Sequence, residues 1–130
     1  SIPTLLPVDG VLSADYENQT NIGTSQHRGI DIAGNKGDLV KASADGVVIF
    51  SGWTFDLGNL MIIYHGNGFY TYYGHNQRCL LPRGSFVEKG DAIAMLGSTG
   101  ISSAPHLHFE IWKDGVSYDP KEFILAFSNI

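Results

Sequence analysis

The chain has 130 residues, which suits a single domain with one hydrophobic core. Apolar residues make up 43% of the chain and charged residues 16%, a balance that excludes a disordered tail. The net charge of −5, without a cluster of lysine and arginine, argues against nucleic acid and anionic membrane surfaces as partners, and no apolar run approaches the roughly 20 residues of a transmembrane helix.

The first 26 residues show little periodic pattern. The stretch "SADYENQTNIGTSQ" is polar and rich in turn-forming residues. We therefore interpret residues 1–26 as an N-terminal extended or loop segment, and we expect residues 27–130 to form a single domain.

Eight short strands are expected after residue 26, because eight stretches are rich in Val, Ile, Tyr and Phe and are bounded by Gly, Asn or Asp. In chain order they are "GIDIA", "LVKAS", "GVVIFSG", "NLMIIYH", "GFYTYYG", "AIAMLG", "HLHFEIW" and "VSYDP". The pairs Asn67-Gly68 and Asp114-Gly115 suit tight hairpin turns, which need positive φ angles. The pattern predicts an all-β fold of antiparallel sheets with short connections.

Two further features refine this fold. "KGDLVKASADG" (36–46) resembles "KGDAIAMLGSTG" (89–100), which indicates two copies of one small β unit. In "DPKEFILAF", Asp119 suits a helix N-cap, Pro120 the first helical position and Glu122 the capping-box position, so we expect one short C-terminal helix.

The single cysteine, Cys79, cannot form an internal disulfide. Its neighbour Arg78 would favour a thiolate, but "LLP" follows directly. We interpret Cys79 as a buried or loop residue and not as a nucleophile.

The histidines carry the strongest chemical signal. His27 and Asp31 in "HRGID" are spaced i, i+4, and His106 and His108 in "HLH" share one face of a strand. An imidazole and a carboxylate on one face are suitable metal ligands, and the "HLH" strand can supply a third, although spacing does not decide which histidine this is. Two histidines and one aspartate leave a fourth position open, as in catalytic zinc sites.

Together, "HRGIDIA", "TYYGH" and "PHLHFEI" resemble the signature of the lysostaphin-type zinc metallopeptidases, which cleave peptides of peptidoglycan. The resemblance extends from about His27 to "DPKEF". It implies a compact antiparallel β domain of the duplicated hybrid-motif type with a substrate groove, so that residues 27–130 are a metallopeptidase domain. The same resemblance implies that His27, Asp31 and His108 bind Zn²⁺ and that His75 and His106 are catalytic.

Three other polar residues lie near these motifs. His65 matches a position that the resemblance places at a turn, and we interpret it as structural. Tyr73 is expected to pack in the interior although it has the strand parity of His75. Glu110 has the parity of His106 and His108. It is either a partner of a histidine or a solvated side chain, and we favour the solvated interpretation.

The expected function is zinc-dependent hydrolysis of peptide stems or cross-bridges in bacterial peptidoglycan, by a monomer. The expected location is extracytoplasmic: periplasmic, cell-wall-bound or secreted, with association with a phage virion as a further option. Two alternatives stay open, a non-catalytic cell-wall binding or scaffold protein of the same fold, and a histidine phosphocarrier. The "HRGID" aspartate and the "HLH" pair suit a metal site better than a phosphocarrier.

Overall fold

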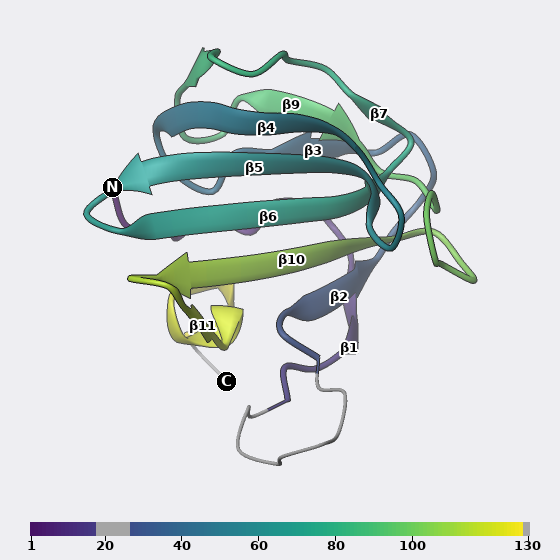
Figure 1. The fold of residues 1–130 in the computed structure, drawn as a ribbon. Coiled ribbons are helices and arrows are strands. Elements are labelled where there is room, and N and C mark those ends of the chain that lie inside the picture. The colour runs from purple at the N-terminus through teal and green to yellow at the C-terminus, as the bar shows by residue number, and fades with distance from the viewer. Residues whose placement is uncertain (18–26, 129–130) are drawn as a thin grey trace.

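The computed structural model of the chain describes residues 1–17 and 27–128. Within these ranges it consists of short strands and two 3₁₀ turns (Figure 1). The elements are β1 (Val11–Ala14), β2 (Ile30–Ala33), β3 (Leu39–Lys41), β4 (Gly46–Thr54), β5 (Gly58–Gly66), β6 (Phe69–Asn76), β7 (Arg78–Cys79), β8 (Phe86–Val87), β9 (Ala92–Met95), β10 (His106–Lys113), β11 (Val116–Tyr118), η1 (Pro120–Glu122) and η2 (Leu125–Phe127).

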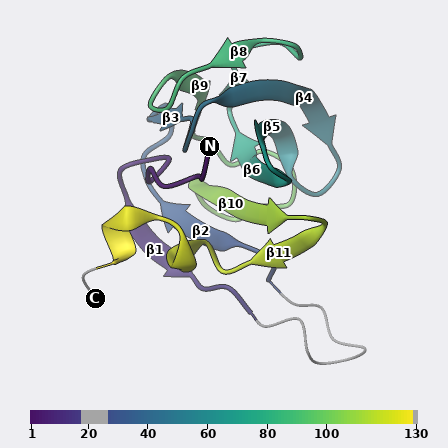
Figure 2. The same ribbon diagram turned by 90° about the vertical axis from the view of Figure 1, so that its left-hand side faces the viewer.

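Most strands belong to one antiparallel sheet in the order β1-β2-β10-β6-β5-β4-β8, with β11 paired to β10. A smaller sheet has the order β3-β9-β7. Figures 1 and 2 show β10, β6, β5 and β4 side by side as the long central strands, with β3 and β9 at one end of the molecule. The prediction of an all-β antiparallel fold is confirmed.

The hydrophobic core takes one face of the long strands. Along β10 the apolar side chains alternate with polar ones, so that the apolar set enters the core and the polar set faces the other way. Within the polar set of β10, His108 and Glu110 are also buried, whereas His106 is partly exposed. The largest fully buried side chains are Tyr73, Phe109, Ile30, Ile32, Met61, Ile63, Ile93, Leu96, Leu107, Ile111, Ile124 and Val40.

All eight strands expected from composition are present, and both expected hairpin turns have the positive φ angles that they require: 52° at Asn67 and 51° at Asp114. Strands β1, β7 and β8 were not expected. β1 lies within the segment predicted as extended or loop, and Val8 of the same segment joins the core. The predicted boundary at residue 26 falls outside the described residues, so this division of the chain stays a prediction.

The C-terminal segment forms two successive 3₁₀ turns where one short helix was expected. Asp119 caps the first turn as predicted, since its side chain accepts a hydrogen bond from the Lys121 backbone N–H at 3.0 Å. The chain leaves the turn at Ile124, whose side chain is buried in the core. Anchoring of this side chain therefore interrupts the helix after a single turn. No helix among residues 1–17 and 27–128 has the length and apolarity needed to cross a membrane.

The two similar "KGD" stretches form matching turns that begin paired strands. Asp38 accepts a hydrogen bond from the backbone N–H of Asn35, and Asp91 accepts one from that of Glu88, both at 2.8 Å. The glycine before each aspartate has a φ of 93° or 91°. The following strands, β3 and β9, pair antiparallel. This correspondence supports the interpretation of a duplicated β unit.

Candidate metal centre and catalytic cleft

A cleft of about 780 Å³ opens where β2, β6 and β10 meet two loops. The loops are those between β4 and β5 and between β9 and β10. All five residues singled out in the sequence for metal binding and catalysis lie in this cleft. Its lining consists of His27, Asp31, Asp56, Leu57, His75, Ile101, Ser102, Ser103, His106 and His108.

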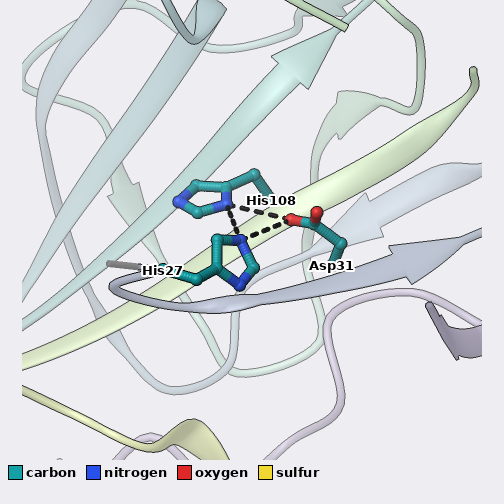
Figure 3. A group of neighbouring side chains, drawn as sticks. All are labelled: His27, Asp31 and His108. Carbon is teal, nitrogen blue, oxygen red and sulfur yellow. Dashed lines mark hydrogen bonds and ion pairs between the residues drawn. The ribbon is translucent and has the colours of Figure 1, made fainter. Parts of the chain in front are cut away.

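Three of these side chains converge on one point, as Figure 3 shows. The Nε2 atom of His27 lies 3.1 Å from Oδ1 of Asp31 and 3.2 Å from Nδ1 of His108. The Nδ1 atom of His108 lies 3.0 Å from the same oxygen of Asp31. Ligand atoms of a tetrahedral zinc ion with bonds of about 2.0–2.1 Å are roughly 3.3 Å apart, so this triangle has nearly the size that zinc requires.

In His27 and His108, the ring nitrogen that points away from this site (the outer nitrogen) determines whether the inner nitrogen carries a proton or a lone pair. Nδ1 of His27 lies 2.7 Å from the backbone carbonyl oxygen of Asp15, and Nε2 of His108 lies 2.6 Å from a carboxylate oxygen of Glu110. Both partners only accept hydrogen bonds, so each outer nitrogen carries the proton. In each neutral ring the inner nitrogen then presents its lone pair toward Asp31. Two lone pairs and a carboxylate at one point require a cation, and these residues could hold a metal ion.

The pKa values of the three groups also indicate that this cluster needs positive charge. Burial opposes protonation of His108, but its hydrogen bonds with Asp31 and Glu110 outweigh burial and raise the pKa to about 9. The hydrogen bond with Asp31 raises the pKa of His27. Burial disfavours the charged form of Asp31, but hydrogen bonds from His108 and His27 hold the pKa of this carboxyl well below its usual value. Without a metal ion, protons therefore supply the positive charge that the cluster needs.

His75 and His106 stand beside the three converging groups with their rings 4.7 Å apart. Nδ1 of His75 lies 2.7 Å from the carbonyl oxygen of Thr99, and Nδ1 of His106 lies 2.8 Å from that of Ala104. In each neutral ring the proton is therefore on Nδ1, and Nε2 is left as the acceptor. Nε2 of His106 is 3.7 Å from Oδ2 of Asp31. Burial lowers the pKa of His75, which favours a neutral ring.

The backbone at His75 explains how its side chain reaches the cleft. Its φ angle is 64°, in the left-handed region that residues other than glycine seldom adopt. Strand parity gave Tyr73 the same face as His75, but the left-handed residue breaks the alternation. Tyr73 is fully buried and hydrogen-bonds Thr71 and Ser43, so the expectation that it packs in the interior is confirmed.

The prediction that Glu110 is solvated is wrong. Its carboxylate is buried, with a 7% exposed residue surface, and both of its oxygens accept hydrogen bonds. The signal was present in the i, i+2 spacing from His108, which places both side chains on one face of β10. His65 is structural as expected, with its two ring nitrogens 2.7 Å from the Asp45 carbonyl and the Thr71 hydroxyl. Sequence reasoning did not find the apolar walls of the cleft, Leu57 and Ile101.

Cys79 is half-buried at the edge of the small sheet and is outside the cleft. Burial raises the pKa of its thiol, which opposes the thiolate form. This position agrees with the structural interpretation of the cysteine.

Comparisons with known proteins agree on one peptidase family. The family model for peptidase family M23 matches residues 25–120. The chain is 42% identical over 107 residues to the murein hydrolase activator NlpD of Salmonella dublin, over 80% of this chain and 28% of that protein. It is 43% identical over 94 residues to the DD-carboxypeptidase/endopeptidase Mpg of Neisseria meningitidis, over 72% of this chain and 22% of that protein. The chain thus spans about a quarter of the length of these relatives.

Solved structures agree with the sequence comparison. A zinc-containing peptidase from Vibrio cholerae superposes with a TM-score of 0.84 and 28% identity, over 92% of this chain and 39% of that one. The catalytic domain of lysostaphin from Staphylococcus simulans superposes with a TM-score of 0.73 and 32% identity, over 88% of this chain and 89% of that one. These similarities confirm the resemblance drawn from the "HRGIDIA", "TYYGH" and "PHLHFEI" motifs.

Proposed function

Because this chain belongs to peptidase family M23, we propose that it is a zinc-dependent endopeptidase that hydrolyses peptide bonds in bacterial peptidoglycan. One observation carries the proposal. Four histidines in one cleft each have one ring nitrogen engaged by a carbonyl or carboxylate oxygen, so that four second nitrogens are available for a metal ion and for proton transfer.

His27, Asp31 and His108 are the proposed zinc ligands. Two imidazole nitrogens and one carboxylate oxygen leave the fourth position of a tetrahedral ion open, which is typical of catalytic and not of structural zinc sites. A bound zinc ion supplies a Lewis acid that makes water more acidic and polarises a carbonyl oxygen.

His75 and His106 are the proposed proton-transfer residues. The neutral ring of His75 presents Nε2 as a proton acceptor, and the lowered pKa of His75 keeps it in this form at neutral pH. His106 stands next to it and is held in orientation by the Ala104 carbonyl. A protonated imidazole at this place donates a hydrogen bond to negative charge that develops on a substrate oxygen, an interaction whose loss costs on the order of 3 kcal/mol in other hydrolases.

Peptidoglycan peptide is the proposed substrate because of the family and of the relatives' names, which refer to murein hydrolase activation and to DD-carboxypeptidase/endopeptidase activity. The location proposed for this chain is outside the cytoplasmic membrane, where peptidoglycan lies. Association with a virion finds no support in these similarities and is not part of the proposal. Family membership also favours hydrolysis over the phosphocarrier alternative.

The test is digestion of purified peptidoglycans of several chemical types, with the released fragments read by mass spectrometry. We expect new peptide termini from the zinc-loaded protein and none after chelation. His106→Ala is expected to keep its zinc, measured by elemental analysis, but to lose cleavage by about 10²- to 10⁴-fold, the usual contribution of a general acid or base. Asp31→Asn is expected to lose both zinc and cleavage. A zinc-loaded protein that cleaves no peptidoglycan would contradict the proposal.

A second candidate function is activation of a separate murein hydrolase. The observation that favours it is the 42% identity to a protein named as such an activator. The same assay distinguishes the two functions when a purified murein hydrolase is added. If this chain is an activator, both the wild type and the His106→Ala variant accelerate the added hydrolase. If it is an endopeptidase, the wild type cleaves without the added hydrolase and the His106→Ala variant does not.

A further inference from the structure

Glu110 is a buried carboxylate behind the cluster of His27, Asp31 and His108. It lies on β10 between His108 and Trp112, at spacings of two residues, so that the three side chains follow one another on the same face of the strand. A buried carboxylate is costly unless hydrogen-bond donors compensate for the lost water. The surroundings of Glu110 therefore indicate what maintains it there.

Both oxygens of Glu110 are used. Oε2 lies 2.6 Å from Nε2 of His108, and Oε1 accepts a hydrogen bond of 2.6 Å from the indole Nε1–H of Trp112. Hydrogen bonds to an ionised acceptor are short and strong, and two of them fix the carboxylate plane. Trp112 thus orients Glu110, and Glu110 orients His108.

Space for this carboxylate depends on Gly29, in the "HRGID" motif. A Cβ atom at position 29 would lie 2.9 Å from Cγ of Glu110 and 2.2 Å from the carbonyl oxygen of Phe109. Gly29 thus allows β10 and the chain between His27 and Asp31 to approach closely. The glycine of that motif and the glutamate of "HLHFE" are parts of one arrangement.

We propose that Glu110 is a positioning residue of the metal centre: its carboxylate, held by Trp112, keeps the proton of His108 on Nε2 and thereby directs the Nδ1 lone pair toward His27 and Asp31. The inference rests on the metal site of the proposed function, and it adds the reason why His108 binds through Nδ1. In zinc proteins, removal of such a partner behind a histidine ligand typically lowers metal affinity by about 10- to 100-fold.

Glutamate is required at position 110 for a reason of hydrogen-bond chemistry. His108 Nε2–H and Trp112 Nε1–H are both donors, and a carboxylate accepts from both. A glutamine at position 110 has one accepting oxygen and one donating amide group, so one of the two donors would face another donor. If the amide group faces His108, the ring is driven to carry its proton on Nδ1, the atom that faces Asp31.

The test measures zinc affinity by competition with a chromophoric chelator. We expect Glu110→Gln to bind zinc about 10- to 100-fold more weakly than the wild type. The matched control is Glu88→Gln, the same chemical change at an exposed glutamate, which is expected to leave zinc affinity unchanged. Thermal unfolding of the zinc-free proteins shows whether each variant is folded.

The decisive variant is the double substitution Glu110→Gln with Trp112→Phe. Phenylalanine removes the competing donor, so the glutamine can turn its oxygen toward His108 and restore the Nε2–H tautomer. We therefore expect the double variant to bind zinc more tightly than Glu110→Gln alone, although it has lost more of the native contacts. Trp112→Phe alone is expected to change the affinity by only a few fold, because Glu110 still accepts from His108. The comparison also removes the effect of charge, since neither glutamine variant has the carboxylate.

The outcomes separate the two proposals. Wild-type affinity in Glu110→Gln overturns the inference about Glu110, and so does a double variant that binds zinc as weakly as Glu110→Gln or more weakly. Zinc binding that follows the expected order, without cleavage of any peptidoglycan, overturns the proposed peptidase function and supports the inference. A wild-type protein that binds no zinc overturns both.

Discussion

At the scale of single residues, each histidine of the cleft has one ring nitrogen beside a hydrogen-bond acceptor, and this acceptor determines which of the two nitrogens carries the proton. Backbone carbonyl oxygens of Asp15, Thr99 and Ala104 hold three of the rings, and the Glu110 carboxylate holds that of His108. The difference matters because a carboxylate supplies negative charge as well as an acceptor. Burial lowers the pKa of His108, but its hydrogen bonds with Asp31 and then Glu110 outweigh burial and raise it to about 9.

The solvated interpretation of Glu110 was wrong because it treated a charged residue in a strand as exposed by default. Charged residues are seldom buried unless they are paired. The partners of Glu110 are His108, two residues before it, and Trp112, two residues after it, on the same face of the strand. The alternation "His-x-Glu-x-Trp" was therefore the informative pattern.

His65 permits a prediction on pH, because it is a buried histidine outside the cleft. Burial lowers the pKa of His65 in the folded protein, whereas the unfolded chain binds this proton near pH 6.5. Below about pH 6.5 the unfolded state therefore binds more protons than the folded state, and the free energy of unfolding falls as the pH falls toward the folded pKa. We expect the wild type to lose more stability than His65→Gln between pH 7.5 and pH 5.

The measurement is urea denaturation of both zinc-free proteins at the two pH values. Other titrating groups are present in both proteins and cancel in the difference. His65→Gln is expected to be less stable at pH 7.5, because it changes the hydrogen bonds to Asp45 and Thr71. An equal loss in both proteins on acidification would show that His65 accepts a proton freely in the folded state.

At the scale of elements, composition identified eight of the strands and missed three short ones, although Val87 of β8 belongs to the core. β7 and β8 have two residues each, and β1 is half-exposed along its length. Such strands form because a neighbouring strand offers free backbone groups, and pairing with a neighbour leaves little trace in the strand's own sequence. The same reason explains why the polar N-terminal segment adds β1 to the edge of the large sheet beside β2.

The contact between β2 and β10 permits a prediction at position 29. Gly29→Ala would place a methyl group 2.2 Å from the Phe109 carbonyl oxygen, so the strands have to move apart. We expect a loss of about 1–3 kcal/mol in the free energy of unfolding, as for overpacked interiors, together with weaker zinc binding. Chemical denaturation and chelator competition measure the two effects.

Gly52→Ala is the control, because a methyl group there meets its nearest neighbours at an ordinary 3.6 Å. Its stability is expected to stay within about 0.5 kcal/mol of the wild type. A Gly29→Ala protein as stable as Gly52→Ala, with native zinc affinity, would mean that the close approach of the two strands is not required.

At the scale of the whole molecule, the proposed ligands join parts of the chain that are far apart in sequence. His27 and His108 are separated by 81 residues, and Asp31 on β2 stands opposite His108 on β10 in the strand register. A metal ion bound here would tie the N-terminal part of the large sheet to its centre. Ligand binding to the folded state alone stabilises that state.

Zinc removal is therefore predicted to lower the melting temperature. At a free zinc concentration 100 times the dissociation constant, the stabilisation is about 2.7 kcal/mol. For a domain of this size that corresponds to a shift of roughly 10 °C. Scanning calorimetry of the zinc-loaded and chelator-treated protein measures it, and Asp31→Asn is expected to show no such shift. Equal melting temperatures of the two wild-type samples would contradict binding to the folded state.

From the sequence we could predict the all-β class, eight of the strands and the hairpin turns at Asn67 and Asp114, because side-chain alternation and positive φ angles are local properties. The resemblance in "HRGIDIA", "TYYGH" and "PHLHFEI" identified the five residues of the candidate site. Which of their atoms converge is known only from the folded chain. The fold placed Nε2 of His27 against Nδ1 of His108, turned His75 into the cleft by a left-handed backbone angle, and buried Glu110 between His108 and Trp112. The physical reason is that the partner of the opposite ring nitrogen sets the direction of a lone pair. For His27 and His75 that partner is a backbone carbonyl oxygen, of Asp15 and of Thr99, which the chain brings near only when it folds.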